Sequence, residues 1–309
     1  MVRHWKKFEL PLLLVLALTA AFAAGPERAT LIREASLYAS AGSNAQRLSQ
    51  VGRGSGLTIL ERSNADGQPW MKISMAADQE AEVSREVTGW LPAKAVVTGA
   101  TTNGDQIIFG QAVDSERQAE ERGGRKGAAE DALRLYSRVA ELFPSSPLAA
   151  EAMWRAADIR WQLAKTAFVR TAKPMEQKYL LAVIAKFPQS KQAELAAYDL
   201  LEGQMCQEWR GQAECPQKES AVYEQYAREH PQSPKAAEAL YNAAWRQAAL
   251  ADIYRIENDS AKSEAARKKA AALAQQIAGQ YPQGDWKPRA LDLIYKLEKK
   301  IPIYGVLIE

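Results

Sequence analysis

Phe143-Pro144-Ser145-Ser146-Pro147 ends one helical stripe of apolar residues and begins another helix. Before it, apolar side chains recur at three- and four-residue steps, as on one buried face of a helix. These residues are Leu133, Tyr136, Val139, Ala140 and Phe143. Ser146 is suited to cap the next helix, and Pro147 suits its first turn. The stretch therefore predicts a helix, a sharp stop and a second helix.

The same stop returns three more times. The copies are Phe187-Pro188-Gln189-Ser190, His230-Pro231-Gln232-Ser233-Pro234 and Tyr281-Pro282-Gln283-Gly284. Their prolines follow Pro144 at successive separations of 44, 43 and 51 residues, and an alanine-rich segment follows each of the first three stops. A helix pair cannot bury its apolar face alone, so we predict an all-α solenoid of about four stacked helix pairs over residues 128–300.

Residues 27–98 have a different pattern, in which short apolar runs are separated by turn residues such as Asn64-Ala65-Asp66-Gly67. This pattern predicts a small all-β barrel or sandwich, so the fold class is multi-domain, β then α. Residues 99–127 are polar and glycine-containing, and we predict a linker carrying one short helix. Residues 301–309 form an apolar C-terminal tail that either folds back on the last helix or adds as a strand to a sheet edge.

Four runs in the β-rich segment occur in the order found in bacterial SH3 domains. They are Ser36-Leu37-Tyr38, Gly56-Leu57-Thr58-Ile59-Leu60, Trp70-Met71-Lys72-Ile73 and Gly89-Trp90-Leu91. Residues 27–98 therefore resemble an SH3-like (SH3b) domain, which implies a small β-barrel and a groove that contacts cell-wall peptides. An acidic stretch between Ala76 and Thr88 departs from the family pattern and lengthens the segment before Gly89.

The helical half is similar to tetratricopeptide-like repeats. The spacing from Tyr136 to the Phe-Pro stop and the stretch Ser146-Pro147-Leu148-Ala149-Ala150-Glu151-Ala152 resemble those of outer-membrane-assembly lipoproteins and of the coordinator protein of the Tol–Pal system. The resemblance implies a concave surface that binds proteins or peptides. The repeat here is longer than the 34 residues of the standard tetratricopeptide unit.

The N-terminus predicts a signal peptide over residues 1–23. Arg3, Lys6 and Lys7 precede an apolar run from Leu10 to Ala24, and cleavage after Ala23 places small residues at the positions that a signal peptidase reads. The run is too short for a bilayer-spanning anchor, which is the alternative. We therefore expect secretion across the inner membrane, a periplasmic or cell-envelope location, and no stable membrane span after cleavage.

The charge balance argues against a nucleic-acid partner. The formal charge of +3 includes a net +2 from the predicted signal peptide, so the mature chain is close to +1. A protein that binds nucleic acid by neutralising phosphates needs a stronger basic field.

Cys206 and Cys215 are the only cysteines. Export places them where disulfides form and persist, so we predict a Cys206–Cys215 bridge around a short loop. Two thiols make a poor zinc site, and their spacing is not that of a C-x-x-C redox motif.

The sequence predicts no catalytic residue, no metal site and no cofactor. His230, the one histidine of the predicted mature chain, occupies the slot that Phe143, Phe187 and Tyr281 hold at the other stops, so we interpret it as a packing residue. The glycine-rich Gly52-Arg53-Gly54-Ser55-Gly56 lacks the Gly-Lys-Ser/Thr ending of a phosphate loop, and we predict a hairpin between two strands.

Five aromatic residues are candidates for binding. Trp154 and Trp161 are seven residues apart and share a helix face, either in the core or as an aromatic strip that receives a peptide. Trp70, Trp90 and Tyr38 suit either a groove or the barrel core. We expect a non-catalytic adaptor or scaffold that binds proteins or peptides, with peptidoglycan as a further candidate ligand. The alternatives are a targeting protein associated with a cell-wall hydrolase and a purely structural envelope protein.

Overall fold

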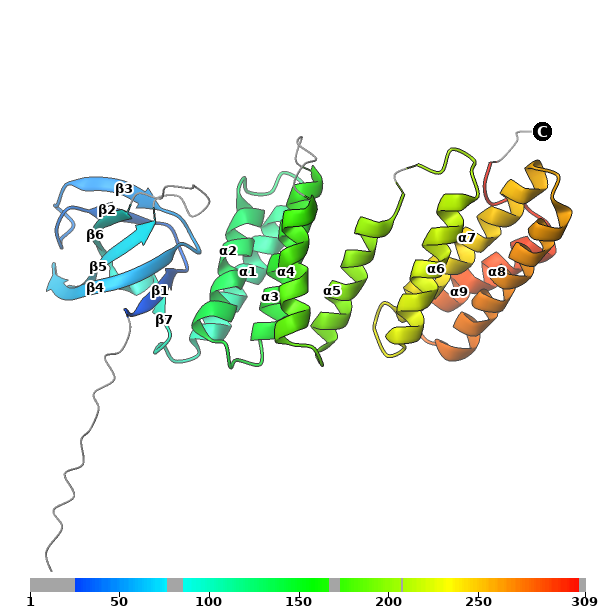
Figure 1. The fold of residues 1–309 in the computed structure, drawn as a ribbon. Helices are drawn as coiled ribbons and strands as arrows, with labels where there is room; N and C mark the ends of the chain where they lie inside the picture. Colours follow the sequence, from blue (N-terminus) through cyan, green and yellow to red (C-terminus); the bar gives the residue numbers. More distant parts are fainter. Residues whose placement is uncertain (1–25, 77–85, 167–172, 207, 306–309) are drawn as a thin grey trace, which may run out of the picture.

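The computed structural model describes residues 26–76, 86–166, 173–206 and 208–305 (Figure 1). Within them an antiparallel sheet comes first and α helices follow, which confirms the predicted β-then-α order. The predicted signal peptide, most of the acidic stretch before Gly89 and the last four residues of the tail lie outside the described residues.

The seven strands form one sheet in the order β3-β2-β6-β5-β4-β1-β7. Their bounds are β1 (Arg28–Leu31), β2 (Ala35–Tyr38), β3 (Arg47–Val51), β4 (Gly56–Ala65), β5 (Gln68–Ala76), β6 (Glu86–Pro92) and β7 (Val96–Thr98). Leu31, Leu37, Ile73 and Leu91 are fully buried and form its core. Asp66 and Gly67 both have positive φ in the tight turn that joins β4 to β5, the conformation that a two-residue hairpin requires.

Nine α helices follow in the described part of the chain. Their bounds are α1 (Gly104–Glu120), α2 (Ala128–Leu142), α3 (Ala149–Thr166), α4 (Lys173–Lys186), α5 (Lys191–Leu201), α6 (Glu214–Glu229), α7 (Ala236–Ile256), α8 (Ser260–Gln280) and α9 (Trp286–Glu298). Helix α1 occupies most of the predicted linker. It has fully buried Ile108 and Ala112 and packs on α2, so the packed helical region begins at Gly104.

The four sequence stops are helix ends with one geometry. At each stop the aromatic residue is the first after the helix, and its backbone N–H donates to the carbonyl four residues earlier. These bonds are Phe143 to Val139 (3.0 Å), Phe187 to Val183 (2.9 Å), His230 to Tyr226 (2.8 Å) and Tyr281 to Ile277 (2.9 Å). All four accepting residues are buried, so each stop is tied to the core stripe of its own helix.

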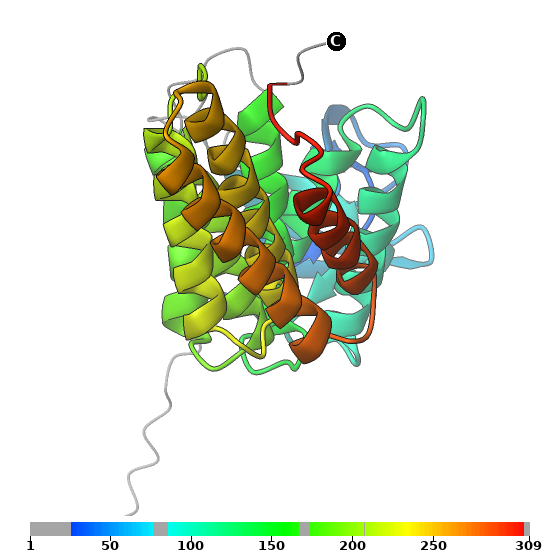
Figure 2. The ribbon, with the colours of Figure 1, turned by 90° about the vertical axis from the view of Figure 1, so that its right-hand side faces the viewer.

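The helices pack mainly on their neighbours in sequence, and α3 also contacts α5 while α7 contacts α9 (Figures 1 and 2). Side chains continue these contacts from α1 to α3 through Glu116 and Arg155, and from α5 to α7 through Tyr198 and Asn242. The second helices of successive pairs therefore share one side of the helical region. Among the described residues, no helix is long and apolar enough to cross a bilayer.

The loop from Gly52 to Gly56 joins β3 to β4, which are not neighbours in the sheet, so the hairpin prediction is wrong. The loop instead joins the sheet to α2. Arg134 Nε donates to the Arg53 carbonyl (3.0 Å), and Arg138 Nε donates to the Gly54 carbonyl (3.2 Å). The loop is also bonded to β1, since the Gly54 N–H donates to the Leu31 carbonyl (2.7 Å), so β1 and α2 together hold it.

Replacing Gly54 with alanine should destabilise this junction by about 1 to 3 kcal/mol. Gly54 has φ +74°, and an added Cβ would lie 2.7 Å from Arg134 Cβ and 3.0 Å from the Leu135 nitrogen. Gly67→Ala is the matched control, because Gly67 has φ +73° with no atom within 4 Å of the added Cβ. Urea denaturation should show the larger loss for Gly54, and equal losses would mean that the contact with α2 is unimportant.

Candidate functional site

The candidate site is the side of the helical region that α3, α5 and α7 share. We call it the α3–α5–α7 face and define it by Trp154 and Asp158 of α3, Tyr198 and Asp199 of α5, and Asn242 of α7. All five side chains are half-buried. Trp154 Nε1 donates to Asp199 Oδ2 (3.0 Å), and Asn242 Nδ2 donates to the Tyr198 hydroxyl (3.1 Å). The face therefore combines aromatic rings and carboxylates from consecutive helix pairs.

Trp154 and Trp161 both reach the next helix pair. Trp161 is only 2% exposed, and its Nε1 donates to Glu202 Oε2 (3.0 Å). Both indoles pack in the cluster formed by Leu180, Val183 and Ala196. Trp161 is thus a packing residue in this conformation, whereas half-buried Trp154 also presents part of its surface to solvent.

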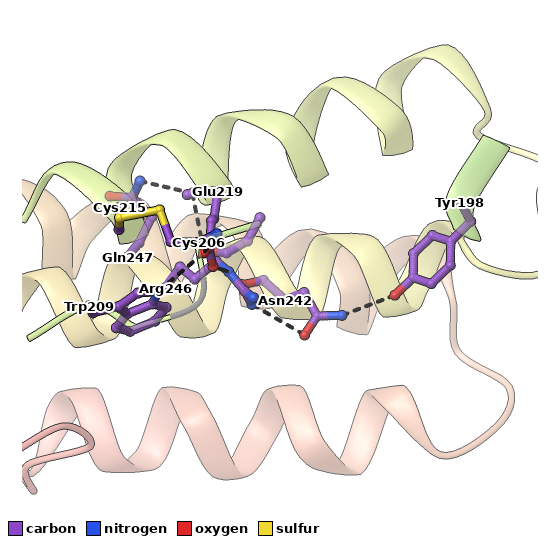
Figure 3. Close-up of polar contacts among 10 residues, drawn as sticks. Tyr198, Cys206, Trp209, Cys215, Glu219, Asn242, Arg246 and Gln247 are labelled. Atoms are coloured by element: carbon purple, nitrogen blue, oxygen red, sulfur yellow. Dashed lines mark hydrogen bonds and ion pairs between the residues drawn. A yellow bond between two sulfur atoms is a disulfide. The ribbon is translucent and has the colours of Figure 1, made fainter. Parts of the chain in front are cut away.

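A buried ion pair stands at the far end of the face (Figure 3). Glu219 of α6 is 1% exposed and accepts a hydrogen bond from Arg246 Nε of α7 at 2.6 Å. Its other oxygen accepts from the Cys206 backbone N–H (2.9 Å) and from Trp209 Nε1 (3.2 Å). Arg246 Nη1 continues the network to the backbone and side-chain oxygens of Asn242. The network therefore connects the α3–α5–α7 face to the loop before α6.

Aromatic rings surround the Arg246 guanidinium. Its Cζ lies 4.5 Å from the centroid of the Tyr223 ring and 5.8 Å from that of Trp209, within reach of cation–π attraction. Trp209 also stands 5.5 Å from Trp245 and 5.5 Å from Tyr304, between ring centroids. We call Trp209, Trp245 and Tyr304 the aromatic cluster. All three side chains are half-buried, so each packs against the protein and leaves part of its surface exposed to solvent.

The described part of the C-terminal tail folds back, as one of the two sequence alternatives predicts, but onto α7 rather than only onto the last helix. The backbone N–H groups of Ile303 and Tyr304 both donate to Asp252 Oδ2, at 2.7 and 3.1 Å. The Tyr304 hydroxyl accepts from the Gly211 N–H (3.2 Å). The tail is thereby held against the loop before α6.

The predicted pairing of Cys206 with Cys215 is confirmed: their sulfurs are at bonding distance and their Cα atoms are 6.0 Å apart. The bridge closes the loop that carries Trp209 and the Glu219 donor Cys206. It therefore joins the start of α6 to the segment that supplies the aromatic cluster.

Two carboxyl groups on the face have pKa values above their ordinary values. Burial, followed by the charges of Asp158 and Glu202, raises the pKa of Asp199 to about 6, although the Trp154 donor opposes the shift. Burial also raises the pKa of Asp158. Neither group has an ion-pair partner within the described residues. Carboxyl groups whose ionised form is destabilised by burial are typical of binding and catalytic sites.

Asp199→Asn should stabilise the protein at pH 7.5 by about 1 to 2 kcal/mol. Asparagine can still accept from Trp154 but carries no charge to desolvate. Because the folded-state pKa is above the unfolded value of 3.8, the cost of ionising Asp199 is fully present above about pH 6 and is lost as the pH falls towards 4. Thermal denaturation across this range should show the gain shrinking with falling pH, and a pH-independent gain would contradict the assignment.

The β-sheet aromatics occupy two environments. Trp70 is 1% exposed, donates to the Ala65 carbonyl (3.1 Å) and meets Tyr38 edge to face at 5.5 Å. Trp70 is therefore a core residue. Tyr38 pairs in register with Trp90 across β2 and β6, and both remain half-buried.

His230 lies at the end of α6, with its ring centroid 4.8 Å from that of Tyr226. This placement agrees with its interpretation as a packing residue. No cluster of three or more His, Cys, Asp and Glu side chains arranged to hold a metal occurs in the part of the chain that the structure describes.

A scan against protein-family models finds no match to this chain, and neither does a search of curated proteins. The site is therefore interpreted from its own geometry.

The sequence reasoning missed most of this site, including Tyr198, Trp209, Glu219, Asn242 and Arg246. Tyr198 and Trp245 were detectable as aromatics in the alanine-rich second helices, where a helix that only packs would favour small residues. Glu219 had no local signal, because its partners come from α7 and from the loop closed by the disulfide.

Proposed function

We propose that this protein is an exported, non-catalytic adaptor that binds a protein or peptide segment along the α3–α5–α7 face. In this proposal the helices form a tetratricopeptide-like solenoid and the sheet is an SH3-like barrel that contacts a second ligand, with cell-wall peptides as the candidate. One observation supports the proposal most: half-buried Asp199 accepts a hydrogen bond from half-buried Trp154, and half-buried Asp158 is close enough for its charge to raise the pKa of Asp199. Neither carboxyl has a cation of its own within the described residues.

The charges around the face indicate a basic partner segment. Lys165 is 3.0 Å from Glu202, and Lys235 is 2.8 Å from Glu238. These two lysines pair most closely with other carboxyls, and their charges offset those of Asp158 and Asp199 only in part, since the pKa of both aspartates is still raised. A lysine or arginine from a partner would neutralise the remaining negative charge and could stack on Trp154, whereas the Tyr198 ring already has the Lys235 ammonium 5.2 Å from its centroid. Complementary charge would also speed association and make it sensitive to salt.

A lysine pentapeptide with blocked ends tests this charge preference on the full mature chain. We expect it to change tryptophan fluorescence with an affinity that falls as salt is added, and a glutamate pentapeptide to have no effect. Asp158→Asn combined with Asp199→Asn should weaken lysine-peptide binding at least tenfold. Asp114→Asn, on exposed α1 surface, is the matched control and should bind as the wild type does. Equal affinity of the double variant and the control would refute the proposed face.

The natural partner can be sought with a photo-crosslinking residue placed at Asn242. The same residue at Lys268, which is exposed on α8, is the control. A specific adduct should form in cells at position 242, and adding the two aspartate substitutions should remove it. Adducts of equal yield at both positions would indicate non-specific contact.

The sheet has its own test. Co-sedimentation with purified peptidoglycan should be lost in Trp90→Ala of the full chain, because Trp90 is half-buried, whereas Trp70 lies in the core. Binding that is unchanged in Trp90→Ala, or absent from the wild type, would remove cell wall as the ligand of the sheet.

A further inference from the structure

A small cavity lies between α7, α8, α9 and the returning tail. Its volume is about 60 Å³, and its apolar walls include Ala248, Ala251, Leu297 and Ile303. Four cationic side chains also line it: Arg255, Arg267, Lys296 and Lys300. Arg267 is the least exposed of the four, at 21%, while Arg255 and Lys300 are exposed, so the four like charges meet at the edge of an apolar cavity where an anion would offset their repulsion.

The protein supplies only part of that compensation. Asp252 is the one carboxylate among the described residues that line the cavity, and its Oδ2 already accepts the N–H groups of Ile303 and Tyr304. Arg255 Nε remains 3.7 Å from Asp252 Oδ1, which is beyond hydrogen-bond distance. The lining therefore has more positive charge than its own carboxylate neutralises.

Arg267 is the clearest sign of an unfilled partner position. Its Nε is buried and makes no hydrogen bond within the described residues. The nearest paired carboxylate oxygen, Glu264 Oε2, is 3.7 Å away on a side chain that is 53% exposed. Lys296 is likewise paired outward with Asp292, which is 54% exposed. A buried guanidinium donor without an acceptor is costly unless a ligand satisfies it.

We propose that this cavity binds one small oxyanion of the phosphate or carboxylate type, with Arg267 and Lys300 as its principal contacts. Guanidinium and ammonium groups are the usual partners of such anions. The cavity volume suits one such group and not a nucleotide. This site is separate from the α3–α5–α7 face and does not depend on the function proposed for that face.

Thermal denaturation of the full mature chain tests the site, with chloride, acetate and phosphate compared at constant ionic strength and pH. Phosphate, acetate or both should raise Tm above its value in chloride, and the rise should grow with the logarithm of the anion concentration. Arg267→Gln and Lys300→Gln should each lose most of the rise. Lys268→Gln, the exposed neighbour of Arg267, removes the same charge and should keep the full rise.

Arg267→Gln also relieves repulsion, so in chloride it should be at least as stable as the wild type. Lys300 is exposed, so its variant gives a second measure of the site that does not depend on replacing a largely buried side chain. Vesicles of phosphatidylglycerol, compared with phosphatidylcholine, distinguish a lipid headgroup from the free anion: additional protection by the anionic vesicles assigns the headgroup as the source. The site is refuted if no free anion raises Tm, or if Lys268→Gln reduces the rise as much as the two lining variants do.

Discussion

Arg246→Ala should destabilise the protein by about 3 to 5 kcal/mol, because it leaves the carboxylate of Glu219 buried without its cation. The Glu219 side chain is 2% exposed and that of Arg246 is 14% exposed, so solvent cannot replace the lost partner. The remaining donors, Cys206 N–H and Trp209 Nε1, are both neutral. Urea denaturation followed by circular dichroism at a helix wavelength measures the change.

Two further variants separate the buried charge from simple loss of a side chain. Arg62→Ala breaks an exposed pair with Glu27, whose side chains are 53% and 38% exposed, and should cost less than about 1 kcal/mol. Combining Arg246→Met with Glu219→Leu removes both charges and should recover much of the loss seen in Arg246→Ala. A loss below about 1 kcal/mol in Arg246→Ala would mean that Glu219 gains water or a proton, which contradicts the buried ion pair.

The helix ends were predictable from sequence because their signals are local. An aromatic residue followed by proline stops a helix within its own turn, so Phe143, Phe187, His230 and Tyr281 could be identified without knowledge of the fold. The turn at Asp66-Gly67 is local in the same sense. The disulfide could also be predicted, because the chain has only two cysteines and a signal-like N-terminus.

The elements that sequence reasoning missed depend on distant partners. The sequence of helix α1 is polar because only a few of its side chains, including Ile108 and Ala112, are buried against α2. The sequence of the loop from Gly52 to Gly56 predicts a hairpin, because nothing local indicates its contacts with Arg134 and Arg138, about 80 residues later. The candidate site was missed for the same reason, because the role of Arg246 depends on Glu219 of another helix and on the Trp209 ring.

Loss of the disulfide is expected to have the second large effect. Cys206→Ser combined with Cys215→Ser should cost about 2 to 3 kcal/mol, since the bridge closes a loop of about ten residues whose freedom in the unfolded chain it restricts. The loop also supplies two of the hydrogen-bond donors to Glu219 and places Trp209 against Trp245 and Tyr304. Freeing it should therefore loosen the aromatic cluster and the returning tail together.

Tryptophan fluorescence should shift to the red in the serine variant before global unfolding, because Trp209 and Trp245 become more solvated. Proteolysis should cut first between residues 206 and 215. Wild-type protein treated with a reductant should reproduce both effects, and the serine variant should not respond to reductant at all. If the variant keeps wild-type fluorescence but is less stable, the bridge stabilises the protein only by restricting the unfolded chain. The buried pair of Glu219 with Arg246 would then suffice to hold the loop, and Arg246→Ala in the oxidised protein should by itself produce the red shift.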